Sequence, residues 1–420
     1  MARLDARLDP DRPAPVALAL SGGGDSMALL HLAAEWARRR RRPLLALTID
    51  HRLSPSSADW TRFAGDAAAR AGALWRPLIW DEARDGPGVS ARARAARHRL
   101  LATAAREAGA RVILTGHTAD DVREGDWMRA EGSTLGRLRD WSPSPVWPEG
   151  RELMLMRPLL DEGRAALRAW LGARGQAWID DPANADPRFA RSRARAALAG
   201  TGEGPAAAPR ADAPASPVLL DESVAWAGVL TLGRETLDAA GLGAALLSAG
   251  GGDTPPRGER LARLHARLIA GEAFASVLAG ARVEARGERV RIMREPGERR
   301  RREPSDRTLR AGHEEVWDGR FTLGVAEGGW RAEASEGRLS QLSPRDRARL
   351  AQLPPAARAV LPVLVRDDGR APILAWRVAE TRALAPRRLA LRLGETTQER
   401  DLFQPFHGET PPTDLFSRQD

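Results

Sequence analysis

The sequence predicts two folded parts, an α/β domain built on a parallel sheet and a smaller α+β region after it. Over residues 13–130, short apolar runs alternate with longer amphipathic segments, a pattern typical of strands connected by helices and therefore of a parallel sheet. A stretch rich in glycine, alanine and proline then separates this half from one of different texture. A chain of 420 residues is also longer than one ordinary domain.

The expected elements of the first half alternate along the chain. Short apolar runs predict strands, and apolar residues at helical spacing between them predict helices. The strands are expected at residues 15–20, 44–49, 74–80, 111–115 and 153–156. The helices are expected at residues 26–39, 57–71, 89–108 and 162–173, with a loop at 142–150.

The domain boundary is expected at residues 201–217, which contain almost no large apolar side chains and have the composition of a linker. Residues 1–200 would then form the α/β domain, with a helical extension from about residue 157, and residues 218–420 the α+β region. Two hairpins are expected in that region, around the turns at 286–288 and 367–369.

Composition excludes several classes of site. The chain has no cysteine, so disulfides, thiolate zinc sites, iron–sulfur clusters and a cysteine nucleophile are impossible. No run approaches the ~20 apolar residues of a membrane span, and the N-terminus is polar, so we expect a cytoplasmic protein. The net charge is +9 and all 65 basic residues are arginine. Arginine pairs with phosphate and stacks on bases, which favours a polyanionic partner, but biased codon usage gives the same composition.

A glycine-rich motif follows the first predicted strand. Glycines allow the backbone to turn tightly and approach a ligand closely, and the N–H groups of the helix that begins there favour an anion. Asp25 would repel phosphate, so a bound cation is its expected partner. Neither a Walker A nor a GxGxxG pattern is present, and a serine-capped glycine turn is the structural alternative. The motif consists of Ser21, Gly22, Gly23, Gly24, Asp25 and Ser26.

A second polar motif follows the fourth predicted strand and contains His117, Asp121 and Glu124. Their spacing of four and three residues would place them on one face of a helix. Two carboxylates and an imidazole suit metal binding, amine recognition or proton transfer. An acidic helix N-terminus, favoured by the helix dipole alone, would have the same composition.

A third motif places Asp50 at the end of the second predicted strand, where it could reach a ribose or a metal, or simply cap a helix. In an open α/β sheet, ligands bind beyond the carboxyl ends of the strands. The three motifs occupy three such ends. We therefore expect them to meet at one ligand site.

These residues resemble the SGGxDS signature of the PP-loop ATP pyrophosphatase superfamily and, within it, the family of tRNA(Ile)-lysidine synthases. The resemblance covers roughly residues 14–198, and its most discriminating part is the Trp-x-x-Asp-Pro-x-Asn stretch from Trp178 to Asn184. The sequence departs from the family at His98 and Ser192, where tyrosine and asparagine are usual. The other matching positions are Ser21–Ser26, Asp50–Leu53, the helix at 91–100 with Arg97, Gly116–Asp121 with Glu124, Arg157–Leu160, Phe189, Arg191 and Arg195.

The resemblance implies a Rossmann-like PP-loop domain that uses ATP and Mg²⁺. The implied substrates are free lysine and the isoleucine tRNA with a CAU anticodon. ATP would adenylate the C2 oxygen of the wobble cytidine and release pyrophosphate. The ε-amine of lysine would then displace AMP and give lysidine.

The resemblance also implies roles for individual residues. Ser21–Ser26 and Asp50 would bind ATP, and Asp25 and Asp121 would hold the metal. The region after residue 218 would bind tRNA. The catalytic residues would be Asp121, Glu124, Arg191 and His117.

Two other interpretations are a different PP-loop adenylating enzyme and a catalytically silent tRNA-binding relative. The absence of cysteine disfavours the sulfur-inserting members of the superfamily. The intact residues Ser21–Ser26, Asp121 and Glu124 argue against a silent binder. The sequence leaves the oligomeric state open, with a dimer among the candidates.

Overall fold

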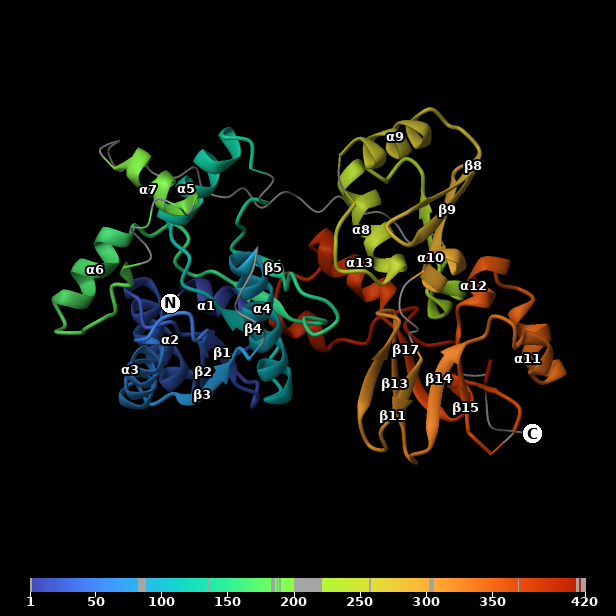
Figure 1. The fold of residues 1–420 in the computed structure, drawn as a ribbon, viewed down its shortest axis with the longest axis horizontal. Helices are drawn as coiled ribbons and strands as arrows, with labels where there is room; N and C mark the ends of the chain where they lie inside the picture. The colour runs from blue at the N-terminus through green and yellow to red at the C-terminus, as the bar shows by residue number, and fades with distance from the viewer. Residues whose placement is uncertain are drawn as a thin grey trace. The chain divides into compact units, whose positions relative to one another are not determined.

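The computed structural model divides the chain into two compact units (Figure 1). The first comprises Met1–Ala213 with Thr396–Gln404, and the second Pro214–Glu395 with Pro405–Asp420. The predicted linker at 201–217 lies outside the described residues, as do Asn184 and Phe189. The structure describes residues 2–81, 88–133, 136–182, 186, 188, 190–199, 221–256, 258–301, 306–368, 370–412 and 415–416.

The first unit is built on a six-stranded sheet with the strand order β3-β2-β1-β4-β6-β5. All neighbouring pairs are parallel except β5 with β6, so the predicted parallel sheet is confirmed for five strands. The antiparallel β5 corrects the expected loop at 142–150, because Trp141–Pro143 pairs with β6. The strands are β1 (Val16–Ala19), β2 (Leu44–Asp50), β3 (Leu74–Ile79), β4 (Val112–Leu114), β5 (Trp141–Pro143) and β6 (Met154–Met156).

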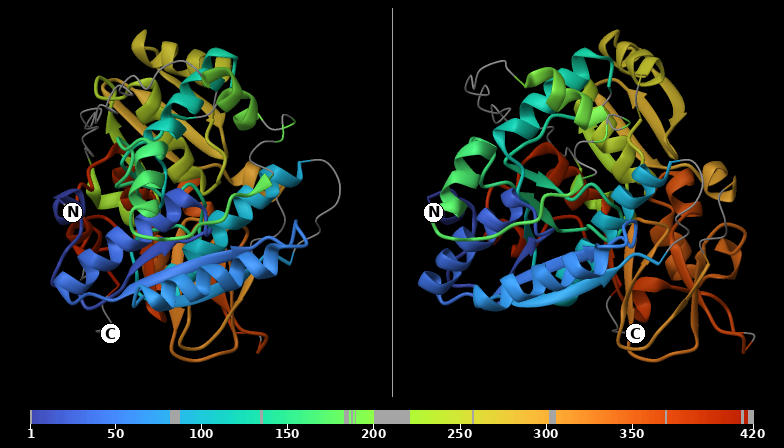
Figure 2. Two further views of the ribbon diagram at one scale, coloured as in Figure 1. Left: turned by 90° about the vertical axis from the view of Figure 1, so that its left-hand side faces the viewer. Right: turned by 60° about the vertical axis from the view of Figure 1, so that its left-hand side comes forward.

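The helices of this unit pack against the sheet and against one another (Figure 2). One apolar core joins the strands β1, β2 and β4 to the alanine-rich face of the helix at residues 89–107. The helices are α1 (Ala2–Arg7), α2 (Gly24–Arg40), α3 (Ser57–Arg70), α4 (Val89–Glu107), α5 (Ala119–Ala130), α6 (Arg164–Gly172) and α7 (Ala190–Leu198).

The two central strands bring two of the polar motifs to the same edge of the sheet. β1 and β4 are parallel neighbours, with Leu18 opposite Leu114, so their carboxyl ends lie side by side. The chain that leaves β4 then passes close to the start of α2. A Cβ added at Gly116 would lie 3.1 Å from backbone atoms of Asp25 and Ser26, which is a tight contact, so this approach favours glycine.

A short segment near the C-terminus, Thr396–Gln404, belongs to the first unit and contains the 3-10 helix η5 (Glu399–Phe403). Two guanidinium nitrogens of Arg42 donate to the two carboxylate oxygens of Glu399, each at 2.6 Å. Both side chains are fully buried. The indole of Trp141 donates to the carbonyl of Thr396 at 2.8 Å. The sequence-based division had assigned this segment, with the rest of residues 218–420, to the α+β region.

The second unit contains three antiparallel sheets, in agreement with the predicted α+β region. Their strand orders are β7-β10-β9-β8, β11-β14-β15-β16 and β12-β13-β17. Both predicted hairpins are present, as β9 with β10 and β15 with β16. The strands are β7 (Leu230–Gly233), β8 (Phe274–Leu278), β9 (Ala281–Arg286), β10 (Arg289–Arg294), β11 (Arg307–Leu309), β12 (Glu314–Trp317), β13 (Phe321–Val325), β14 (Trp330–Ala334), β15 (Pro362–Val365), β16 (Ile373–Leu374) and β17 (Ala379–Ala383).

Among the described residues of this unit, two apolar cores support the sheets. The first lies between the β7–β10 sheet and three helices, and the second contains Trp317, Phe321 and neighbours from the other two sheets. No helix in the described ranges is long and apolar enough to cross a membrane. The helices are α8 (Ala239–Gly250), α9 (Gly258–Ile269), α10 (Pro296–Arg301), α11 (Pro344–Leu350), α12 (Pro355–Ala359) and α13 (Ala385–Leu393), with 3-10 turns η2 (Glu222–Ala227), η3 (Leu339–Gln341) and η4 (Ala375–Arg377).

Candidate active site

The glycine-rich motif forms the turn between β1 and α2. Gly22 has a φ of +83°, which favours glycine, and a Cβ there would lie 2.6 Å from Cδ1 of Ile179, so that side chain would have to shift. The N–H of Ile179 donates to the carbonyl of Gly22 at 2.9 Å. The discriminating stretch that begins at Trp178 therefore lies against the loop.

The two serines of the motif hold the turn closed. The Ser26 hydroxyl accepts from the N–H of Ser21 at 3.3 Å and donates to the carbonyl of Gly23 at 2.9 Å. The two hydroxyl oxygens lie 3.1 Å apart. These bonds fix the loop at the N-terminus of α2, where free N–H groups and the helix dipole favour an anion.

The acidic motif begins α5 with a capping box. The carboxylate of Asp121 accepts from the N–H of Thr118 at 2.9 Å and from its hydroxyl at 3.1 Å. Thr118 is therefore the N-cap, and His117 lies before the helix rather than on the face of Asp121 and Glu124. This corrects the expectation that all three share a helix face. Asp121 and Glu124 are buried on α5, and His117 contacts the hydroxyl of Thr115.

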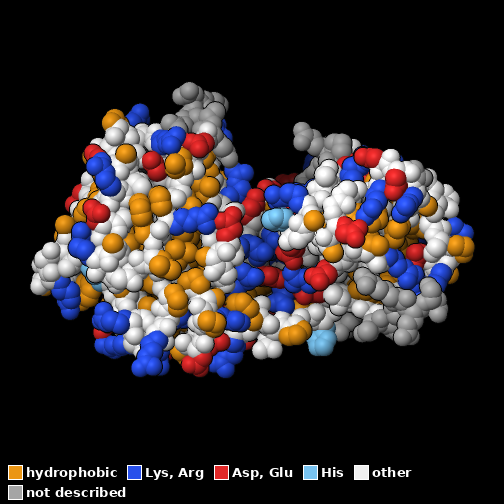
Figure 3. Space-filling view, turned by 90° about the horizontal axis from the view of Figure 1, so that it is seen from below, with side chains coloured by type: hydrophobic (Ala, Val, Ile, Leu, Met, Phe, Trp, Pro, Cys, Tyr) orange, Lys and Arg blue, Asp and Glu red, His pale blue; other side chains and the backbone are white. Residues whose placement is uncertain are grey.

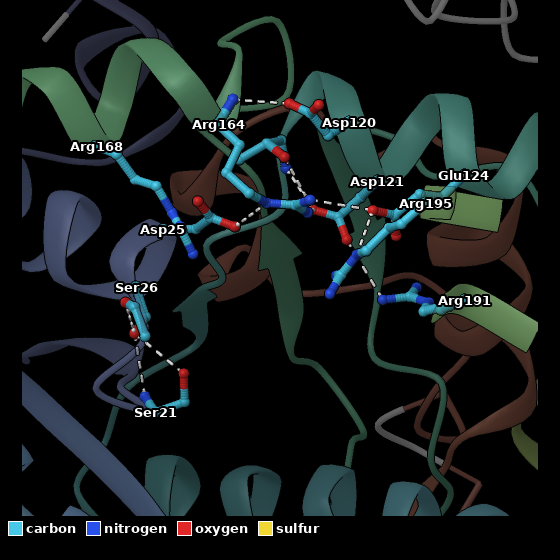
Figure 4. Close-up of polar contacts among 12 residues, drawn as sticks. Ser21, Asp25, Ser26, Asp120, Asp121, Glu124, Arg164, Arg168, Arg191 and Arg195 are labelled. Atoms are coloured by element: carbon cyan, nitrogen blue, oxygen red, sulfur yellow. Dashed lines mark hydrogen bonds and ion pairs between the residues drawn. The ribbon is translucent and has the colours of Figure 1, made fainter. Parts of the chain in front are cut away.

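Arg164, the first residue of α6, links the two motifs (Figure 4). Its Nε lies 3.1 Å from Oδ2 of Asp25, and one terminal nitrogen lies 3.1 Å from Oε1 of Glu124. The other terminal nitrogen is 3.7 Å from Oδ2 of Asp121. The backbone N–H of Arg164 donates to Asp120 at 2.7 Å, which fixes the start of α6. Carboxylates from α2 and α5 thus surround one guanidinium.

Two further arginines, from α7, reach the same carboxylates. Nε of Arg195 is 2.7 Å from Oε1 of Glu124. A terminal nitrogen of Arg191 is 3.4 Å from Oδ1 of Asp121. In Figure 4 both side chains lie on the far side of the carboxylates from Asp25.

The cluster leaves two carboxylate oxygens open. Oδ1 of Asp25 and Oε2 of Glu124 are buried and accept no hydrogen bond from the described part of the chain. Burial raises the pKa of Asp25 even though Arg164 opposes the shift. An unpartnered buried acceptor is costly in a ligand-free protein, so these oxygens indicate the place of a cation or an N–H donor.

Asp121 differs from Asp25 in its electrostatic surroundings. Burial pushes the pKa of Asp121 upward, but His117, the Thr118 N–H and Arg191 outweigh that effect. The pKa of Asp121 therefore lies below its ordinary value, and the carboxylate stays charged at neutral pH.

Two histidines, His98 and His117, and several arginines lie beside this acidic cluster. Burial, followed by Arg94 and Arg97, lowers the pKa of His98 to about 3. Burial, followed by Arg157, lowers the pKa of His117 to about 4. Both imidazoles are therefore neutral at physiological pH, while the arginines keep their charge. The positive charge beside the carboxylates favours an anionic ligand group.

Residues 1–201 match the family model of the PP-loop domain. A tRNA(Ile)-lysidine synthase from Caulobacter vibrioides is 46% identical over 95% of this chain and 98% of its own length. The chain belongs to the tRNA(Ile)-lysidine synthase family. Family members from Hyphomonas neptunium and Brucella suis are 37% and 36% identical, over 69% and 74% of this chain and 84% and 74% of theirs.

The resemblance to this family implied Mg²⁺ beside ATP. No group of three or more potential metal-ligating side chains occurs among the described residues. Mg²⁺ in nucleotide sites is commonly held by one or two carboxylates together with phosphate oxygens. Asp25 and Asp121, which contact the same guanidinium, match this donor set, and the open Oδ1 of Asp25 is available to it.

Asp50 has a local structural role in this family member. Its Oδ1 accepts from the N–H of Arg52 at 2.8 Å and from the hydroxyl of Ser57, the first residue of α3. The neighbouring His51 lies beside Arg97 and Trp80, and burial lowers its pKa to about 4. These bonds form a local turn and do not cap α3, whose N-cap is Ser56. ATP binding by Asp50 stays a prediction.

Sequence reasoning missed Arg164 and gave no role to Arg195, although both contact Glu124 directly. One signal was available for Arg164. It lies in the first turn of the helix predicted at 162–173, where the dipole disfavours a cation, so another interaction had to keep it there.

Proposed function

We propose that this chain joins lysine to C2 of the wobble cytidine in the CAU-anticodon isoleucine tRNA, with ATP converted to AMP and pyrophosphate. The observation that carries this proposal is the acidic cluster with open, buried oxygens beside a loop suited to phosphate. Such a site can bind ATP, a cation and an amine together. Because the substrate is tRNA, we place the reaction in the cytoplasm.

In the first step, the turn Ser21–Ser26 would bind the phosphates of ATP at the N-terminus of α2. Mg²⁺, when bound, neutralises charge that develops on the phosphate oxygens. Asp25 and Asp121 would hold it. The pyrophosphate leaves from a site whose donors are already in place, which lowers the barrier to adenylation.

In the second step, Asp121 and Glu124 would bind the ammonium group of lysine. The amine must lose a proton before it attacks, and the open Oε2 of Glu124 would accept that proton. His117 is neutral because its pKa is about 4, so it can orient the amine by hydrogen bonding without repelling it. Arg191 would face the lysine carboxylate or the adenylate phosphate.

The second unit would supply contacts that choose the tRNA. Phosphate contacts give affinity, whereas contacts to bases give choice, and an anticodon base must be unstacked to react. Basic side chains lie on the surfaces of both units, mixed with acidic ones (Figure 3). The sequence has a run of four arginines at 299–302, of which Arg302 lies outside the described residues. Arg300 pairs with Glu336 and Arg301 with Glu298, which makes the run a weak candidate for phosphate contacts.

Nucleoside analysis of the tRNA tests the proposal. The CAU isoleucine tRNA is incubated with protein, ATP and lysine, digested, and analysed by mass spectrometry. We expect lysidine only when lysine and ATP are both present, and none in the methionine tRNA with the same anticodon. Pyrophosphate release without lysidine would favour another adenylating reaction. Bound tRNA with no pyrophosphate release would favour a silent binder.

A further inference from the structure

Arg164 has a position that the helix alone does not explain. Its backbone N–H is bound by Asp120 at the N-terminus of α6, and a positive side chain there opposes the helix dipole. Its guanidinium instead contacts Asp25, 139 residues away in the chain, together with Glu124. The carboxylates, rather than α6, determine where this side chain lies.

The guanidinium occupies the place that a cationic ligand would need. Its three nitrogens contact Asp25, Glu124 and Asp121 at 3.1, 3.1 and 3.7 Å. These are the carboxylates to which the proposed function assigns Mg²⁺ and the lysine ammonium. Two positive charges at the same oxygens repel each other strongly in a partly dry site. A cation can therefore bind fully only when Arg164 moves away.

Arg164 can leave only by movement of its side chain. Arginine does not lose its proton in proteins, and the neighbouring carboxylates raise the pKa of Arg164 further, against the effect of burial. Its side chain is 20% exposed, whereas its backbone is held by Asp120. The open Oδ1 of Asp25 allows an incoming cation to make a first contact before the arginine has moved.

We propose that Arg164 is a positioning residue that occupies the cation site of the ligand-free protein and gives up its contacts with Asp25 and Asp121 when a divalent cation binds. This inference rests on the metal site of the proposed function. It gives Arg164 two effects: it holds the carboxylates in place, and it weakens cation binding in the absence of ATP.

Binding of Mn²⁺, used as a probe for Mg²⁺, distinguishes this role from a merely structural one. The full chain without nucleotide is titrated with Mn²⁺, and free Mn²⁺ is measured by electron paramagnetic resonance. Arg164→Gln is expected to lower the Kd for Mn²⁺ by about tenfold, because one positive charge beside the carboxylates is removed. Arg164→Lys keeps the charge but cannot contact three carboxylates together, and should give an intermediate Kd.

Arg174→Gln is the matched control. Arg174 follows α6 and lies over the ring of Trp170, so its loss should leave the Kd unchanged. Unchanged or weaker Mn²⁺ binding in Arg164→Gln would overturn the proposal, and if that variant does not fold, a wild-type Kd in Arg164→Lys would do so. Neither tRNA nor lysine enters this titration. The two tests can therefore fail separately. Unchanged Mn²⁺ binding in Arg164→Gln would count against the role of Arg164 but not against lysidine formation. The absence of lysidine would count against the proposed function but would not change the measured Kd for Mn²⁺.

Discussion

Two ion-pair groups in the first unit differ in how completely their charges are paired. Glu399 accepts bonds at both oxygens from Arg42, and Oε2 also accepts from the N–H of Asp9 at 3.0 Å. Around Arg164, by contrast, Asp25 and Glu124 each keep one buried oxygen without a partner among the described residues.

This difference distinguishes an ion pair that stabilises the fold from a group of ion pairs that can bind a ligand. A buried pair that satisfies every oxygen attaches the segment Thr396–Gln404 to the first unit, and removal of one partner would leave an isolated buried charge. A group with open oxygens is incomplete until a ligand binds, and it gains less stability from its own contacts.

Asp25→Asn should remove activity without loss of stability. We expect turnover to fall by about 10³-fold or more, because the variant cannot hold a cation against the phosphates. The melting temperature should stay unchanged or rise, since burial raises the pKa of Asp25 and so disfavours its charged form. Pyrophosphate release and thermal unfolding measure the two effects. A large loss of tRNA binding would contradict the assignment of Asp25 to the metal.

Glu399→Ala, by contrast, should lower the stability of the first unit. The loss of one partner leaves Arg42 buried and unpaired, so the first unit should lose about 3–5 kcal/mol of unfolding free energy in urea denaturation. The double variant Arg42→Met, Glu399→Leu should recover most of this loss. A fall of less than 1 kcal/mol in Glu399→Ala would show that pairing does not anchor the segment.

Acidification should destabilise the first unit through its neutral histidines. The pKa of His98 is about 3 and that of His117 about 4, both below the ordinary value, so the unfolded chain binds more protons between these pKa values and about 6.5. Stability is therefore present above pH 6.5 and lost as pH falls toward 4. Between pH 7.5 and 5 we expect a loss of about 4 kcal/mol, about 2 kcal/mol from each histidine, and about half that loss in His98→Gln. An identical pH dependence in the variant would contradict this cause.

Replacement of Arg299, Arg300 and Arg301 by alanine should have the smallest effect on folding. These residues end α10, and the ion pairs of Arg300 and Arg301 are exposed, so the melting temperature should hardly change. If tRNA phosphates lie against the run, affinity should fall and its salt dependence should decrease. Filter binding over a range of salt measures both, and an unchanged slope would assign the run to a solvated surface.

The sequence could predict what local patterns determine. Alternating apolar runs indicated the strands, and the polar motifs after β1 and β4 indicated the edge at which Asp25 and Asp121 meet. The preference for glycine at position 22 also follows from a local feature, its positive φ. Even the position of His117 outside α5 was readable, since Thr118 and Asp121 have the spacing of a capping box.

Long-range pairings could not be predicted in the same way. Arg164 meets Asp25 because α6 packs against α2, and Arg42 meets Glu399 across 357 residues of chain. Periodicity reports which face of an element is buried and does not report which elements meet. In a chain with 65 basic residues, all of them arginine, composition also offers no way to single out Arg42 and Arg164.

The lysine dependence of Glu124→Gln tests the central claim most directly, namely that the open carboxylate oxygen of Glu124 receives the amine. The substitution keeps the shape of the side chain and removes its charge. We predict that the KM for lysine in lysidine formation rises by about tenfold or more while the KM for ATP stays unchanged. An unchanged KM for lysine would contradict the account, because the buried oxygen of Glu124 would then have no ligand to bind.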